Sequence, residues 1–114
     1  QASHEIVATT IVSYEEQTRG WLAYMAKAKT LEQQIKAYER LHRHLNTYAA
    51  IRVMDFDEPA AVEYRAIEHL KQKTGVYDLR IAAIAKCLGA TLISRNARHF
   101  NLVPGLVVED WTRV

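Results

Sequence analysis

Carboxylate side chains stand directly after two short apolar segments of this 114-residue chain. Glu15 and Glu16 follow the first segment, and Asp55 and Asp57 follow the second. A third apolar segment leads into a polar and basic stretch that contains Ser94, Arg95, Asn96, Arg98 and His99. Carboxylate oxygens are preferred ligands of Mg²⁺ and Mn²⁺, and substrate phosphates commonly complete the shell of such an ion. A cluster of this kind suits phosphodiester hydrolysis, in which the metal activates water and holds the leaving oxygen.

Most of these residues also have a purely structural interpretation. Glu16 lies three residues after Ser13, which is the spacing of a capping box at a helix start. Asp57 and Asp78 each stand where a helix N-cap is expected. Ser94 and Asn96 are common turn residues, and an isolated histidine such as His99 is usually an ordinary loop residue. From spacing alone, the structural and chemical interpretations both stay open.

The apolar segments that precede these residues are predicted strands. They are short, rich in β-branched residues and mostly apolar rather than alternating, and they cover Ile6–Val12, Ile51–Phe56, Thr91–Ser94 and Leu106–Val108. Helical patterns separate them. This alternation predicts an α/β fold with a parallel sheet between helices. Ligands bind such folds at the carboxyl ends of the strands, where the polar residues stand.

The helical patterns indicate a hairpin of two helices, about residues 13–50, inserted between the first two strands. Ser13 is the predicted cap of the first helix, in which Gly20 calls for a close contact with another helix. Thr30 and Gln33 form a second capping box. The predicted buried stripe of the second helix is Leu31, Ile35, Tyr38, Leu41, Leu45 and Tyr48, and the opposite, solvated face is Lys36, Glu39, Arg40, Arg43 and His44.

Two further helices are predicted in the second half. One begins at Asp57 with a proline in its first turn and ends at Gly75, and the other covers Leu79–Leu88 after an Asp78 cap and stops at Gly89.

Composition bounds the protein class. Apolar residues make up 49% and charged residues 25%, which is the balance of an ordinary globular chain and excludes intrinsic disorder and a membrane span. Four glycines and two prolines predict a helix-rich fold in a single domain over residues 1–114. One cysteine, Cys87, allows neither an internal disulfide nor a zinc motif and suits the cytoplasm. The net charge of +2 permits a nucleic-acid partner without requiring one.

A D-x-D sequence, Asp55-Phe56-Asp57, offers a remote alternative function. It is similar to the start of aspartate-dependent phosphatases, but those enzymes have Thr or Val where this chain has Pro59. We therefore keep a phosphatase that uses Asp55 and Asp57 only as a third hypothesis.

The C-terminal third resembles PIN-domain ribonucleases, most of all VapC-type toxins of bacterial toxin–antitoxin pairs. The similar stretches are Asp78–Ala85 (DLRIAAIA), Gly89–Asn96 (GATLISRN), Phe100, Val103–Leu106 (VPGL) and Val108–Trp111 (VEDW). Near the N-terminus, Val12–Gly20 resembles the first strand–helix segment of these proteins, with an acidic residue four positions before a glycine. This match places the family carboxylate on Glu16 rather than on Glu15.

The resemblance implies an endoribonuclease that depends on Mg²⁺ or Mn²⁺ and acts as the toxin of such a pair. It implies that Glu16 and Asp78 are catalytic metal ligands and that Asn96 lines the site. His99 is an additional candidate ligand, and Ser94, Arg95 and Arg98 are candidate RNA-binding residues. The implied partners are RNA, an antitoxin protein and a second copy in a homodimer, with no membrane.

Two departures from the family pattern support an alternative. The family begins with a strand that ends in Asp-Thr-Asn, whereas this chain starts at Gln1 without such a strand, and we expect that upstream residues carrying it are missing. His99 also stands where the family usually has an acidic residue. The alternative function is a catalytically incomplete PIN-domain chain that binds only its antitoxin or its own mate.

Overall fold

The computed structural model describes residues 8–93, 100 and 102–109. Contacts within the chain divide it into two compact units, Gln1–Met54 and Asp55–Val114, which we describe separately. None of the helices in the described ranges is long and apolar enough to cross a membrane.

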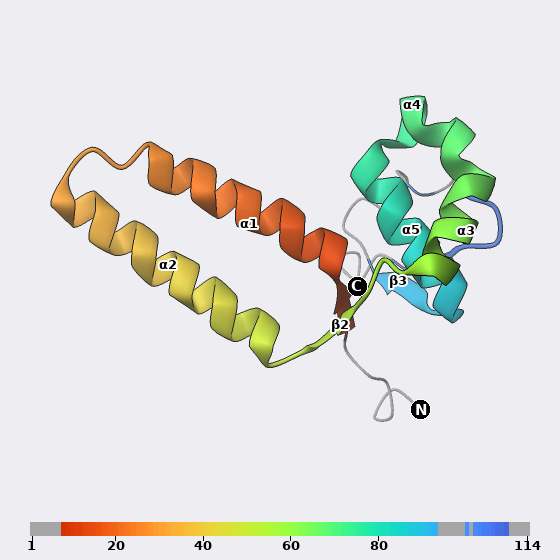
Figure 1. Cartoon of the computed structure of the whole chain (residues 1–114), viewed down its shortest axis with the longest axis horizontal. Coiled ribbons are helices and arrows are strands. Elements are labelled where there is room, and N and C mark those ends of the chain that lie inside the picture. Colours follow the sequence, from red (N-terminus) through yellow and green to blue (C-terminus); the bar gives the residue numbers. More distant parts are fainter. Residues whose placement is uncertain (1–7, 94–99, 101, 110–114) are drawn as a thin grey trace. The chain divides into compact units, whose positions relative to one another are not determined.

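The first unit is a helical hairpin that stands on two short strands (Figure 1). The elements are β1 (Ala8–Thr10), α1 (Ile11–Ala26), α2 (Leu31–Ala49) and β2 (Arg52–Met54). β1 and β2 pair in parallel, with Ala8 opposite Arg52 and Thr10 opposite Met54. The two helices therefore form the crossover between parallel strands, as the alternation of patterns predicted.

α1 begins earlier than the sequence predicted. Thr10 is its N-cap, and the backbone N–H of Ser13 donates to the Thr10 Oγ1 over 3.0 Å. The predicted Ser13–Glu16 capping box is therefore wrong. Its physical reason is that β1 already ends at Thr10, whose extended backbone places the hydroxyl over the first turn.

α2 has the capping box that was predicted for it. Gln33 donates its backbone N–H to the Thr30 Oγ1, and its side-chain oxygen accepts the backbone N–H of Thr30 over 3.2 Å. The buried face of α2, however, is Ala37, His44 and Tyr48, whereas most of the predicted apolar stripe is exposed, including Leu31, Ile35, Tyr38 and Leu45.

Two details of the hairpin correct the sequence prediction. His44 is buried rather than solvated, because its Nε2 hydrogen-bonds the Thr18 Oγ1 at 2.9 Å and its ring stacks on Tyr14. A Cβ atom added at Gly20 would meet nothing within 4 Å, so the predicted close helix contact at this glycine is wrong.

The second unit packs helices around a small core. Its elements are α3 (Glu58–Ile67), a 3₁₀ turn η2 (Glu68–Leu70), α4 (Lys71–Thr74), α5 (Val76–Leu88), β3 (Thr91–Ile93) and β4 (Val107–Glu109). α3 lies against α5, and β3 pairs in parallel with β4. The core cluster comprises Ile67, Leu79, Ala82, Ala83, Phe100 and Val103. The single helix predicted before Gly75 is interrupted at Ile67, whose backbone leaves the helical region where its side chain is buried.

Two glycines define α5. Gly75, with φ of +99°, precedes the helix, and Gly89, with φ of +63°, ends it. At that end Gly89 donates to the carbonyl of Lys86 and Ala90 donates to the carbonyl of Ala85, which is a Schellman motif and confirms the predicted stop. The helix starts at Val76, so the prediction that Asp78 is its N-cap is wrong.

The fold class predicted from the sequence is confirmed: the protein is α/β, rich in helix, with parallel strand pairs. Each described strand has only three residues. The predicted ranges Ile6–Val12 and Ile51–Phe56 are therefore too long, whereas the strand predicted at Leu106–Val108 is shifted by one residue, to Val107–Glu109. The organisation of the two units as one domain stays a prediction.

Candidate functional site

Glu16 lies in the second turn of α1 and is exposed. Because Thr10 caps the helix, Glu16 is not the N3 residue of a capping box. Its neighbour Glu15 forms an ion pair with Arg19 over 3.2 Å, one turn further along α1. The assignment of the family carboxylate to Glu16 stays a prediction.

Asp78 is half-buried in the first turn of α5. A carboxylate in the first turn is stabilised by the positive end of the helix dipole and by N–H groups that have no partner within the helix. Two further polar side chains of this helix start, Tyr77 and Arg80, lie next to each other. The Arg80 guanidinium is 5.8 Å from the Tyr77 ring centroid. Because α5 begins at Val76, Asp78 does not have the N-cap role that the sequence allowed.

A buried hydroxyl lies close to Asp78 in the sequence. Thr74 ends α4, four residues before Asp78, and within the described ranges its buried Oγ1 has no hydrogen-bond partner. Buried polar atoms are normally satisfied by protein or by ordered water. This hydroxyl is therefore a further polar feature of the α4–α5 junction that the sequence did not single out.

Asp57 has the structural role that was its most favoured interpretation. Its Oδ1 accepts the backbone N–H of Ala60 over 3.2 Å and caps α3. Asp55 is exposed in the connection after β2. The Asp57 carboxylate of the D-x-D sequence therefore caps a helix, whereas the phosphatase hypothesis needs it for catalysis. This counts against the phosphatase hypothesis.

Five predicted site residues lie outside the described residues: Ser94, Arg95, Asn96, Arg98 and His99. Glu16 and Asp78 belong to different units, so their convergence on one ion stays a prediction. Their oxygen donors are of the type that Mg²⁺ and Mn²⁺ take. Within the described part of the chain, no group of three acidic, histidine or cysteine side chains is placed to hold a metal.

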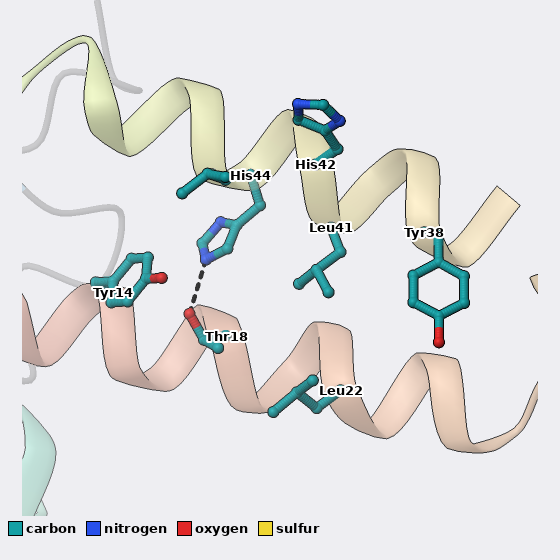
Figure 2. Close-up of a pocket in the computed structure, with 8 residues that line it drawn as sticks. Tyr14, Thr18, Leu22, Tyr38, Leu41, His42 and His44 are labelled. Atoms are coloured by element: carbon teal, nitrogen blue, oxygen red, sulfur yellow. Dashed lines mark hydrogen bonds between the residues drawn. The ribbon is translucent and has the colours of Figure 1, made fainter. Parts of the chain in front are cut away.

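The hairpin contains a pocket that sequence analysis missed (Figure 2). Its volume is about 520 Å³, and its lining is Tyr14, Thr18, Leu22, Tyr38, Leu41, His42, His44 and Leu45. Figure 2 shows the hydrogen bond from Thr18 to His44 crossing between the helices, with Tyr14 beside it. The signal available in the sequence was the one-turn spacing of Tyr14 with Thr18 and of Leu41 with Leu45, on facing helices.

The match to a family model decides the relationship of the chain to known proteins. The model of the PIN domain matches residues 2–106, which is most of the chain. The chain belongs to the PIN domain family. The resemblance seen in the sequence is confirmed, and Glu16 and Asp78 both lie within the matched region.

A curated relative from Salmonella typhimurium, the tRNA(fMet)-specific endonuclease VapC, is 35% identical over 65 residues. That match covers 54% of this chain and 49% of the relative, so the chain spans about half the length of the curated protein it matches.

Solved structures of the VapBC type have the same fold. VapBC2 from Rickettsia felis, bound to a DNA fragment of its promoter, superposes with a TM-score of 0.67 and 23% identity, covering 96% of this chain and 78% of that one. VapBC-5 from Mycobacterium tuberculosis, a member of the VapBC family of toxin–antitoxin systems, gives a TM-score of 0.58 and 24% identity over 90% and 79% of the two chains. At these identities the likeness concerns the fold.

Proposed function

We propose that this PIN-domain chain is a metal-dependent endoribonuclease that acts as the toxin of a toxin–antitoxin pair. Its membership of the PIN domain family carries the proposal. The Salmonella typhimurium relative, an endonuclease specific for tRNA(fMet), supports RNA as the substrate class. The chain's own residues add two carboxylates, Glu16 and Asp78, that no helix cap requires.

The proposed metal ligands are Glu16 and Asp78, with His99 as a third candidate and Asn96 lining the site. When bound, Mg²⁺ or Mn²⁺ supplies an activated water and stabilises the charge that develops on the phosphate. Asp78 is suited to hold a cation because α5 fixes its backbone from the first turn.

The basic residues of the proposed site bind and orient the substrate. Arg95 and Arg98 would hold RNA phosphates, since guanidinium pairs with phosphate through two parallel hydrogen bonds, and Ser94 would donate to the same backbone.

The proposed partners are an antitoxin protein and a second copy of the chain, in the cytoplasm. Two observations support a protein partner. The similar solved structures are VapBC assemblies, and the hairpin exposes large apolar side chains, among them Leu31, Ile35, Tyr38 and Leu45. Antitoxin binding over this surface would hold the nuclease inactive until the antitoxin is lost.

The alternative is a catalytically incomplete chain that binds antitoxin or its own mate. His99, which stands where the family usually has an acidic residue, favours it. The two functions differ in one observable, which is whether the chain cuts RNA.

The deciding experiment is RNA cleavage by the purified chain in Mn²⁺. We expect cleavage that EDTA abolishes and that Asp78→Asn lowers at least about 100-fold, because the variant removes one negative ligand. Glu68→Gln, which neutralises an exposed carboxylate of η2, is the matched control and should cleave as the parent does.

Each other result selects a different function. Folded protein that binds RNA or antitoxin but leaves RNA intact would establish the incomplete chain. Phosphatase activity abolished by Asp55→Asn and spared by Asp78→Asn would establish the third hypothesis instead.

A further inference from the structure

A cation and two aromatic rings meet where α1 and α2 of the hairpin face each other. The Arg40 guanidinium of α2 lies 5.9 Å from the Trp21 ring centroid and 5.7 Å from the Tyr24 ring centroid, both on α1. The two rings are nearly perpendicular, at 88°, with centroids 5.9 Å apart. Arg40 therefore occupies the corner between two aromatic faces.

Further basic residues continue this flank along α2. Lys36 and Arg43 stand one turn before and one turn after Arg40, so the three cations share one helix face. All three residues are exposed, and no carboxylate of the described chain forms an ion pair with any of them. We call Trp21, Tyr24, Lys36, Arg40 and Arg43 the basic–aromatic flank.

The basic–aromatic flank is separate from the pocket. None of its five residues is among those that line the pocket. At 100° per residue, Arg40 lies about 160° around α2 from Tyr38 but only about 40° from His44, so the flank borders the pocket. The hairpin thus has a pocket, drawn in Figure 2, and a basic and aromatic cluster made of other residues.

We propose that the basic–aromatic flank is a binding site for single-stranded RNA, so that the hairpin holds a segment of the substrate outside the Glu16–Asp78 site. This inference rests on the proposed ribonuclease function. Sequence-tolerant recognition of single strands combines cations that follow the phosphates with aromatic rings on which bases stack. Tyr24 offers such a ring, since 42% of its surface is exposed.

The charge of the flank favours RNA over a protein partner. Tryptophan, tyrosine and arginine are also common in protein–protein interfaces, but lysine is depleted there, and the flank contains Lys36 and two arginines without a paired carboxylate. The Arg40 guanidinium has five N–H donors, and the two rings near it accept no conventional hydrogen bond from their faces, so donors are available for a phosphate.

The test measures RNA binding without cleavage. The probe is a fluorescein-labelled single-stranded RNA 12-mer of mixed sequence, titrated in EDTA with the whole chain, and its Kd is read by anisotropy. We expect Arg40→Gln and Trp21→Leu to raise Kd about tenfold each, as loss of a stacking or phosphate contact does. Arg40→Gln should also lower the slope of log Kd against log salt by about 0.7. Arg65→Gln, an exposed arginine on α3, is the matched control and should change Kd less than twofold.

A second measurement leaves Arg40 and Trp21 unchanged. In a Trp111→Phe background Trp21 is the only tryptophan, and saturating RNA should quench its fluorescence. Unchanged Trp21 emission together with an unchanged Kd in Arg40→Gln would overturn the inference, while Asp78-dependent cleavage would still support the nuclease. A quench caused by the antitoxin and not by RNA would identify the flank as a protein interface instead. Absence of any RNA binding by the folded chain would remove the inference and the proposed function together.

Discussion

At the residue scale, the two candidate carboxylates occupy different environments. Glu16 is exposed in the second turn of α1, where no helix terminus stabilises its charge. Asp78 is half-buried in the first turn of α5, where the helix dipole favours a negative side chain. Neutral variants of the two residues should therefore change the free energy of unfolding by different amounts, even if both variants weaken metal binding.

We expect Asp78→Asn to lower the free energy of unfolding by about 0.3–1 kcal/mol, because it removes the charge at the helix N-terminus. Glu16→Gln should stay within about 0.5 kcal/mol of the parent, as surface substitutions do. Urea unfolding measures both values. Mn²⁺ titration of the same proteins should show weaker binding in each variant, and unchanged Mn²⁺ affinity in both would contradict their proposed role as ligands.

Gly20 offers a stabilising substitution. It lies inside α1, and an added Cβ meets nothing within 4 Å. Gly20→Ala should raise the free energy of unfolding by about 1 kcal/mol, since alanine restricts the unfolded chain and favours the helix. Thermal denaturation checks this value. Gly89→Ala is the opposing control, because φ of +63° at that position strains any side chain and should lower stability.

At the element scale, one buried polar contact joins α1 to α2. The His44 Nε2 and the Thr18 Oγ1 are 2.9 Å apart, and the His44 ring packs on Tyr14 and Tyr48. His44 is 7% exposed, so its nitrogen has little access to water if Thr18 is replaced. The contact therefore specifies which faces of the two helices meet.

We expect Thr18→Val to destabilise the chain by about 1–3 kcal/mol, because it leaves a buried ring nitrogen without a partner. Thr18→Val combined with His44→Leu should cost less than the sum of the two single variants, since the double variant has no orphaned polar atom. A double-mutant cycle in urea measures this coupling. Additive effects would show that the hydrogen bond does not join the helices.

At the scale of the whole molecule, we expect the hairpin to offer separate surfaces to its two proposed partners. Its apolar side contains the pocket and exposed side chains such as Tyr38 and Leu45, which suit a protein. The basic–aromatic flank, made of other residues, suits a polyanion. This division would let antitoxin and RNA be recognised by separate residues of the same two helices.

Leu45→Glu should therefore weaken binding of the cognate antitoxin at least about tenfold and leave the Kd for the RNA 12-mer within twofold. Calorimetric titration with the antitoxin and anisotropy with the RNA measure the two affinities. Val62→Glu is the control, because Val62 is similarly exposed, at 60% against 55%, but lies on α3. Equal losses in both variants would show that the pocket side of the hairpin has no special role in antitoxin binding.

The sequence by itself determined the features that depend on residues within one helical turn. The Thr30–Gln33 capping box, the Asp57 cap and the Gly89 stop were all predictable, because each uses a side chain or a φ angle acting on a neighbouring backbone group. The α/β class followed from alternating patterns, and the family followed from the strings around Asp78 and Asn96.

Only the tertiary structure decided where α1 and α5 begin and which face of α2 is buried. Thr10 and Ser13 can both cap a helix, and pairing of β1 with β2 as far as Thr10 selects the first. Leu31 and Ile35 fit the pattern of a buried stripe and His44 does not, but Leu31 and Ile35 are exposed and His44 is buried. His44 can be buried because Thr18 and Tyr14 on α1 contact its ring. Such choices depend on contacts between residues far apart in the sequence, which periodicity along one helix does not contain.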